Sequence, residues 1–368
     1  MLDNRRHHHV RRGGDAVAIR VTPPVTATRR VLLAGMAALP LAACASRMAG
    51  PSSSPAQYVG SVLQFDPALA RIIDPSVRPE VLATGYSWAE GPVWVPAGYL
   101  LFNDPSNNVT YRYVPGGEVE EFRRPSGLAG TVPPEIREAG ANGMAIDPAG
   151  RLVFADSGTR AIAALDLDTM RRTELVETYQ GKRFNSPNDL TITRGGRIYF
   201  TDPPYGFADA DNSPLREVNQ NGLYLHDTDG SLYLLDQHRR PNGVALSPDE
   251  RTLYLALSDE QRPAVLAYTL GDNGRPVGPP RVFHDMQAQF DAGLPGLPDG
   301  LKVDKTGHVF ATGPGGVHIL SPTGQLLGMI STGTAVANCV IGRGDDGGAA
   351  LYMTAHTMLA RVPLRIEV

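Results

Sequence analysis

One short pattern recurs along the chain and constrains its fold more than any other feature. Each copy begins with an oxygen-bearing side chain and continues through a Gly or Asp, a short apolar run, a turn and a second apolar run. Five copies begin at Glu90, Asn142, Asn188, Asn242 and Asp299, which are 52, 46, 54 and 57 residues apart, and a looser sixth begins at Asn338. A repeat of this length indicates an array of similar structural units.

The apolar runs after residue 60 have the character of strands. They are short, rich in β-branched and aromatic residues, and separated by turn sequences such as Asp229-Gly230. About 40 to 50 residues accommodate four short strands, which is the size of a propeller blade. The sequence therefore predicts an all-β fold over residues 71–368, a six-bladed β-propeller with four-stranded antiparallel blades around a central channel.

The six first residues of the copies are expected to meet. Copies in a propeller are related by rotation about its axis, so equivalent positions form one ring at the mouth of the channel. We call Glu90, Asn142, Asn188, Asn242, Asp299 and Asn338 the ring residues.

The first 43 residues have the features of a leader and export signal. Arg29-Arg30 precedes an apolar run, 31–43, that is too short to span a bilayer. The arginine pair resembles a twin-arginine signal, and Leu41-Ala-Ala-Cys44 resembles the lipobox of bacterial lipoproteins. We expect an exported protein, periplasmic or anchored to the membrane through lipidated Cys44, with residues 44–70 as a tether. Cleavage after Ala45, or a disordered N-terminus on a cytosolic protein, are the alternatives.

Composition narrows the range of partners. A net charge of −4 offers no basic stripe, so nucleic acid is not expected to bind. Membrane contact is expected only through the lipid at Cys44. With Cys44 modified, Cys339 is the only other cysteine and no internal disulfide can form. We expect a monomer or a small homo-oligomer.

The chemistry of the ring residues favours a hard cation. Carboxylate and amide oxygens suit Ca²⁺ or Mg²⁺, with Mn²⁺ or Zn²⁺ as substitutes, and Ca²⁺ is the expected ion. The alternative is that Asn and Asp before Gly serve as turn residues. That alternative does not explain Glu90, since Glu is a poor turn former, whereas for Asn142 and Asn338 both roles stay open.

Five motifs together resemble the senescence marker protein/gluconolactonase/luciferin-regenerating-enzyme family, in its gluconolactonase-type branch. They are Glu90-Gly-Pro-Val-Trp, Asn185-Ser-Pro-Asn-Asp-Leu, Tyr199-Phe-Thr-Asp-Pro-Pro-Tyr-Gly, Pro241-Asn-Gly-Val-Ala-Leu-Ser-Pro-Asp and Leu297-Pro-Asp-Gly. The resemblance extends over about residues 75–365. It implies a metal-dependent hydrolase, usually calcium-dependent, that opens a lactone as its small-molecule substrate.

The resemblance also implies roles for individual residues. Glu90, Asn188, Asn242 and Asp299 match the metal ligands, and Asp299 matches the catalytic base or proton shuttle. Asn188 also matches a substrate contact, and Asn142 and Tyr205 are further candidates for binding substrate. Some members carry a substrate-contacting arginine two residues before the equivalent of Asn188; here Ser186 stands there, and the nearest arginine, Arg183, is the candidate for that substrate contact.

Three other functions stay open. The same metal site would serve an organophosphate or ester hydrolase, because both reactions need an electrophile at a cation and a nearby base. A propeller can also be a binding module without catalysis. A histidine-assisted hydrolase would use His284 or His356.

Overall fold

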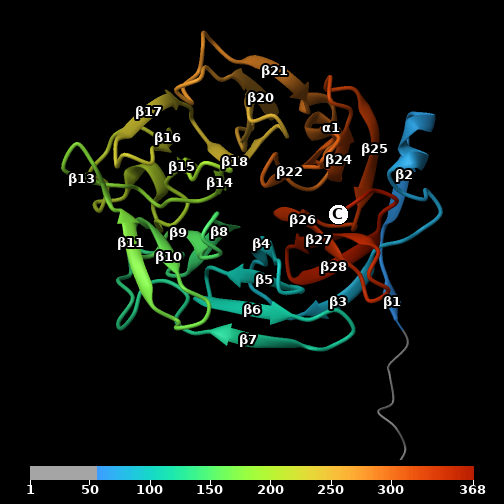
Figure 1. The fold of residues 1–368 in the computed structure, drawn as a ribbon, viewed down its shortest axis with the longest axis horizontal. Coiled ribbons are helices and arrows are strands. Elements are labelled where there is room, and N and C mark those ends of the chain that lie inside the picture. The colour runs from blue at the N-terminus through green and yellow to red at the C-terminus, as the bar shows by residue number, and fades with distance from the viewer. Residues whose placement is uncertain (1–55) are drawn as a thin grey trace, which may run out of the picture. The chain divides into compact units, whose positions relative to one another are not determined.

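The computed structural model describes residues 56–368, and within them the chain forms six antiparallel sheets arranged as the blades of a propeller (Figure 1). The predicted fold is therefore confirmed. The expected leader, Cys44 and the first part of the expected tether lie outside the described residues. No helix among residues 56–368 is long and apolar enough to cross a membrane.

The first three blades each contain four strands in chain order, from the channel outward. Blade 1 contains β4 (Glu90–Val95), β5 (Tyr99–Asp104), β6 (Val109–Tyr113) and β7 (Val119–Arg123). Blade 2 contains β8 (Ala141–Ile146), β9 (Leu152–Asp156), β10 (Ala161–Leu165) and β11 (Arg172–Val176). Blade 3 contains β14 (Leu190–Ile192), β15 (Ile198–Asp202), β16 (Gly222–His226) and β17 (Leu232–Gln237). A two-stranded ribbon, β12 (Thr178–Tyr179) and β13 (Lys182–Arg183), precedes blade 3.

The last three blades follow the same plan, and blades 5 and 6 also take strands from the N-terminal part of the described chain. Blade 4 contains β18 (Pro241–Leu246), β19 (Thr252–Leu257), β20 (Ala264–Thr269) and β21 (Arg281–Asp285). Blade 5 contains β22 (Leu301–Val303), β23 (Val309–Gly313), β24 (Gly316–Leu320), β25 (Leu326–Ser331) and β2 (Ser61–Gln64). Blade 6 contains β26 (Asn338–Arg343), β27 (Ala349–Ala355), β28 (Met358–Pro363), β3 (Glu80–Thr84) and β1 (Gln57–Tyr58). The helices are short: η1 (Pro67–Arg71), η2 (Ala210–Asn212) and α1 (Gln287–Asp291).

The ring of blades closes by pairing the two ends of the propeller sequence. Strand β3 joins the last blade antiparallel to β28, and Glu80 of β3 forms an ion pair with Arg361 of β28 at 2.7 Å. Strands β1 and β2 then add to β3 and β25. Within the expected tether over residues 44–70, Gln57–Tyr58 and Ser61–Gln64 are therefore strands of the propeller.

Six apolar clusters hold the blades together, one between each pair of neighbours. The second strand of each blade is covered on both faces by neighbouring blades, which is why β9 and β23 are buried at every position. Packing on both faces explains the short, continuously apolar runs in the sequence.

The ring residues occur at the channel end of each inner strand, as the repeat predicts. Glu90 and Asn338 begin β4 and β26, Asn142 and Asn242 are the second residues of β8 and β18, and Asn188 and Asp299 lie two residues before β14 and β22. A glycine follows four of the ring residues, and its lack of a side chain lets neighbouring blades approach closely. A Cβ on Gly91 would lie 1.9 Å from the Asn142 carbonyl oxygen.

Candidate active site

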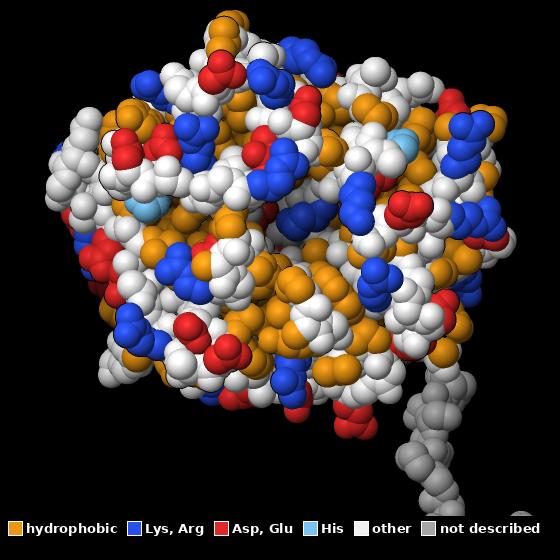
Figure 2. Space-filling model, viewed as in Figure 1, with side chains coloured by type: hydrophobic (Ala, Val, Ile, Leu, Met, Phe, Trp, Pro, Cys, Tyr) orange, Lys and Arg blue, Asp and Glu red, His pale blue; other side chains and the backbone are white. Residues whose placement is uncertain are grey.

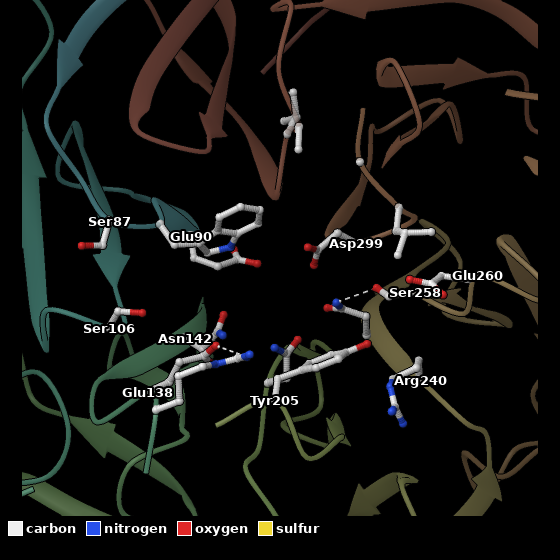
Figure 3. Close-up of a pocket in the computed structure, with 18 of the residues that line it drawn as sticks. Ser87, Glu90, Ser106, Glu138, Asn142, Tyr205, Arg240, Ser258, Glu260 and Asp299 are labelled. Carbon is white, nitrogen blue, oxygen red and sulfur yellow. Dashed lines mark hydrogen bonds and ion pairs between the residues drawn. The ribbon is translucent and has the colours of Figure 1, made fainter. Parts of the chain in front are cut away.

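A cavity of about 970 Å³ opens at the channel end of the inner strands. Of the ring residues, Glu90, Asn142, Asn188, Asn242 and Asp299 line it, and Tyr205 lines it as well. Figure 3 shows the labelled members converging from different blades on one central space. In the space-filling view, the centre of the ring is hollow and a basic side chain is visible inside it (Figure 2).

Four ring residues present buried oxygens that lack any hydrogen-bond partner within residues 56–368. They are the Oδ1 atoms of Asn142, Asn188, Asn242 and Asp299, each from a different blade. A buried acceptor without a partner carries a desolvation cost of about 1–3 kcal/mol. Four of them around one cavity indicate a site shaped for a group that supplies positive charge.

The carboxylates of the cavity are crowded. Burial raises the pKa of Glu90, and the neighbouring Asp189 carboxylate raises it further. Burial also raises the pKa of Asp299 well above its ordinary value, with Glu90 and Asp189 adding to the effect. Like charges held together out of water disfavour ionisation until a cation compensates them.

These residues fit a divalent cation. Three carboxylates (Glu90, Asp189 and Asp299) and the single ammonium of Lys302 leave two negative charges when all are ionised, which a dication would balance. No group of three His, Cys, Asp or Glu side chains among residues 56–368 has the geometry of a metal site. A cation here would therefore depend on the asparagine oxygens as well as on carboxylates, and such oxygen donors suit Ca²⁺ or Mg²⁺.

Asp189 and Lys302 lie close to the ring residues and contact them through Asn338, and neither was expected from the sequence. The Lys302 Nζ donates to Asn338 Oδ1 at 3.2 Å, and Asn338 Nδ2 donates to Asp189 Oδ2 at 3.5 Å. Both ends of the Asn338 amide are thus hydrogen-bonded within the protein. The Asn142 Oδ1, in contrast, has no partner among the described residues. One sequence signal could have revealed Asp189, because it replaces the glycine that follows four of the ring residues.

Two loops joined by backbone hydrogen bonds form one lip of the cavity. The amide N–H groups of Arg137 and Glu138 donate to the Gly206 carbonyl at 2.8 and 3.2 Å. The Ser186 hydroxyl donates to the Pro203 carbonyl at 2.6 Å and accepts from the Gly206 amide at 2.8 Å. Ser186 therefore shapes the loop that carries Tyr205 and does not act in the cavity.

The lip brings a charged pair to the cavity. Arg137 donates to Glu138 Oε1 at 2.7 Å, and the Glu138 side chain is only 14% exposed. Figure 3 shows Glu138 beside Asn142, with the ion pair to Arg137 drawn as a dashed line. This pair was not anticipated, because its loop lies outside the repeated pattern.

Several candidates lie elsewhere. Arg183 is on the β12–β13 ribbon, where its guanidinium donates to the Thr159 carbonyl, and it does not line the cavity described for residues 56–368. His284 pairs with His318 between blades 4 and 5. His356 packs against the ring of Trp88, which does line the cavity.

Comparisons with known proteins agree with this architecture. A family model described as "SMP-30/Gluconolactonase/LRE-like region" matches residues 88–357. A gluconolactonase from Zymomonas mobilis is 41% identical over 347 residues, which cover 91% of this chain and 97% of the relative. A solved gluconolactonase from Xanthomonas campestris is 31% identical, with a TM-score of 0.71, and covers 84% of this chain and 98% of its own. Regucalcin from Agrobacterium tumefaciens, 18% identical with a TM-score of 0.60 over 78% of this chain and 94% of its own, shares the fold. This chain belongs to the SMP-30/gluconolactonase/LRE-like family.

Proposed function

We propose that the chain is a lactone hydrolase that acts in the central cavity and depends on a divalent cation, with Ca²⁺ favoured. The observation that carries the proposal is the set of four buried oxygens without partners among the described residues, at Asn142, Asn188, Asn242 and Asp299. Relatives named gluconolactonase support a lactone as the substrate.

Glu90, Asn188, Asn242 and Asp299 would hold the cation. When bound, such an ion polarises the lactone carbonyl and lowers the pKa of water beside it. Asn142 is left to contact substrate, since its Oδ1 is also buried and without a partner in the part of the chain described.

Asp299 is the proposed base. A neighbouring positive charge lowers the pKa of a carboxyl group, which reverses the effect of Glu90 and Asp189 on Asp299 and leaves it ionised. The Asp299 carboxylate then accepts a proton from the attacking water and returns it to the ring oxygen as the C–O bond of the lactone breaks.

The cavity is lined by apolar side chains, among them Trp88, Phe290 and Leu297, and by polar ones that offer partners for the hydroxyl groups of a sugar lactone. Glu138 and Arg137 lie on one side, and Ser106, Arg240 and Glu260 also line the cavity. Paired carboxylate and guanidinium groups supply acceptors and donors for substrate hydroxyls.

A panel of lactones assayed before and after chelation tests this proposal. We expect chelation to abolish turnover and to lower the melting temperature, because a cation that binds only the folded state stabilises it. Ca²⁺ should restore both, and Mg²⁺, Mn²⁺ and Zn²⁺ are added back for comparison. Turnover of phosphotriesters alone would favour the organophosphate alternative. No turnover of any ester with any of these ions would favour a binding module.

A further inference from the structure

The Ser258 hydroxyl lies between the two segments that carry Asn242 and Asp299. Ser258 directly follows β19, and its Oγ accepts a hydrogen bond from Asn242 Nδ2 at 2.9 Å. The same hydroxyl donates to the carbonyl of Pro298, the residue before Asp299. Figure 3 shows Ser258 at the wall of the cavity, with the bond to Asn242 dashed.

Counting protons determines how the Asn242 amide is oriented. A serine hydroxyl has one hydrogen, and a proline carbonyl can only accept, so the hydroxyl hydrogen of Ser258 goes to Pro298. The end of the Asn242 amide that faces Ser258 must then be the NH₂ group. Its Oδ1 faces the other way, where it is buried without a partner in residues 56–368.

An equivalent serine in the repeat shows what is particular to Ser258. Ser157 directly follows β9, and its hydroxyl donates to the Pro187 carbonyl at 2.9 Å, next to Asn188. Within the described residues, however, Ser157 accepts no bond from an asparagine amide. Ser157 and Ser258 both hold the next blade's loop in place, but only Ser258 also orients an amide.

We propose that Ser258 is a positioning residue. It directs the Asn242 carbonyl oxygen toward the cation site and fixes the position of Asn242 relative to the segment that carries Asp299. This inference rests on the cation dependence proposed above. Partners of metal ligands restrict the orientation of those ligands, and losing one typically weakens metal binding about 10- to 100-fold. Without its acceptor at Ser258, the Asn242 amide can rotate and present NH₂ to the cation.

Calorimetric titration of Ca²⁺ into the chelator-treated full-length protein tests the inference without relying on activity. We expect Ser258→Ala to weaken binding about tenfold or more. Ser258→Thr keeps the hydroxyl, so its dissociation constant for Ca²⁺ should stay within about threefold of the wild-type value. Ser157→Ala, which removes the loop contact alone, is the matched control and should lose far less affinity than Ser258→Ala.

A double-mutant cycle identifies the route of the effect. If Ser258 acts mainly through Asn242, Ser258→Ala should cost no more Ca²⁺ affinity in an Asn242→Ala background than Ser157→Ala, which removes a loop contact alone, costs in the wild type. Equal affinity of Ser258→Ala and the wild type, or an undiminished loss in that background, would overturn the inference alone. A wild-type protein that binds no dication would overturn the cation dependence as well. Should Ser258→Ala fold poorly, a Ser258→Thr protein with tenfold weaker binding would contradict the assignment.

Discussion

Individual ring residues occupy equivalent positions but differ in what surrounds their side chains. Asn142 and Asn188 leave their carbonyl oxygens unpaired among the described residues, whereas the Asn338 amide contacts Lys302 and Asp189. The Asn242 carbonyl oxygen is likewise unpaired in the described part of the chain, so the same residue type at the same repeat position is available to a ligand in three blades and engaged in the protein interior in a fourth. The difference arises from the side chains contributed by other blades.

Replacing Asp299 with Asn tests the proposed base. The amide keeps an oxygen that can face the cation but cannot accept the proton, so we expect kcat to fall by about 10²- to 10⁴-fold. Ca²⁺ binding, measured by calorimetry, should be largely retained. Asp147→Asn, which changes a turn aspartate paired with Arg151, is the control and should stay active. Wild-type turnover in the Asp299→Asn protein would contradict the assignment.

At the scale of elements, the glycines after the ring residues determine how closely the blades approach. Gly243 follows Asn242 in β18, and a Cβ there would lie 2.1 Å from the carbonyl oxygen of Asp299 on the next blade. Cβ atoms do not approach backbone that closely, so the segment bearing Asp299 would have to shift.

We expect Gly243→Ala to reduce both stability and activity. Overpacking of this kind typically costs about 1–3 kcal/mol of unfolding free energy, and it would displace Asp299 from the cavity. Chemical denaturation and the turnover rate measure the two effects. Gly195→Ala is the control, because the nearest atom to its Cβ would be 3.8 Å away. An unchanged Gly243→Ala protein would show that blades 4 and 5 can separate freely.

The contact between blades 4 and 5 also includes a pair of neutral histidines. His284 of β21 donates from Nε2 to His318 Nδ1 at 3.1 Å, because the His318 Nε2 is committed as a donor to the Pro314 carbonyl at 3.0 Å. Burial and the neighbouring His318 lower the pKa of His284 to about 4, although Asp285 opposes this shift. Burial also lowers the pKa of His318.

The two histidine shifts contribute a loss of unfolding free energy in acid, opposite in sign to the contribution of Glu90 and Asp299, whose pKa values are raised. Between the unfolded value near 6.5 and the folded value near 4, the unfolded chain binds more protons, so the unfolding free energy falls as the pH drops through that window. His284→Gln removes one titrating group and should flatten the dependence. Urea denaturation at pH 7.5 and 4.5 gives the change in unfolding free energy between the two pH values. An equal change for the wild type and for His284→Gln would refute this prediction.

At the scale of the whole molecule, ring closure creates the site. The pairing of β3 with β28 joins segments far apart in the chain and holds all six inner strands around one channel. Only after closure do Glu90 of the first copy and Asp299 of the fifth face the same cavity. The stability of the site therefore depends on packing between every pair of blades.

Much of this could be predicted from the sequence. The spacing of the repeat predicted six blades, and the first residue of each copy predicted the ring, because rotation brings equivalent positions together. Five of the six ring residues, together with Tyr205, line the cavity. Arg183, a further candidate for binding substrate, lies on the β12–β13 ribbon and does not line this cavity, because closeness in sequence to Asn188 does not ensure closeness in space.

The sequence by itself determined the blade, the number of blades and the oxygen chemistry of the ring, because these depend on local patterns repeated at a fixed interval. Only the tertiary structure decided which amides stay unpaired, which carboxylates crowd together, and that Arg137, Glu138 and Ser258 join the site. Those features depend on side chains from different blades and loops, which no repeat period relates, so they exist only once the ring has closed.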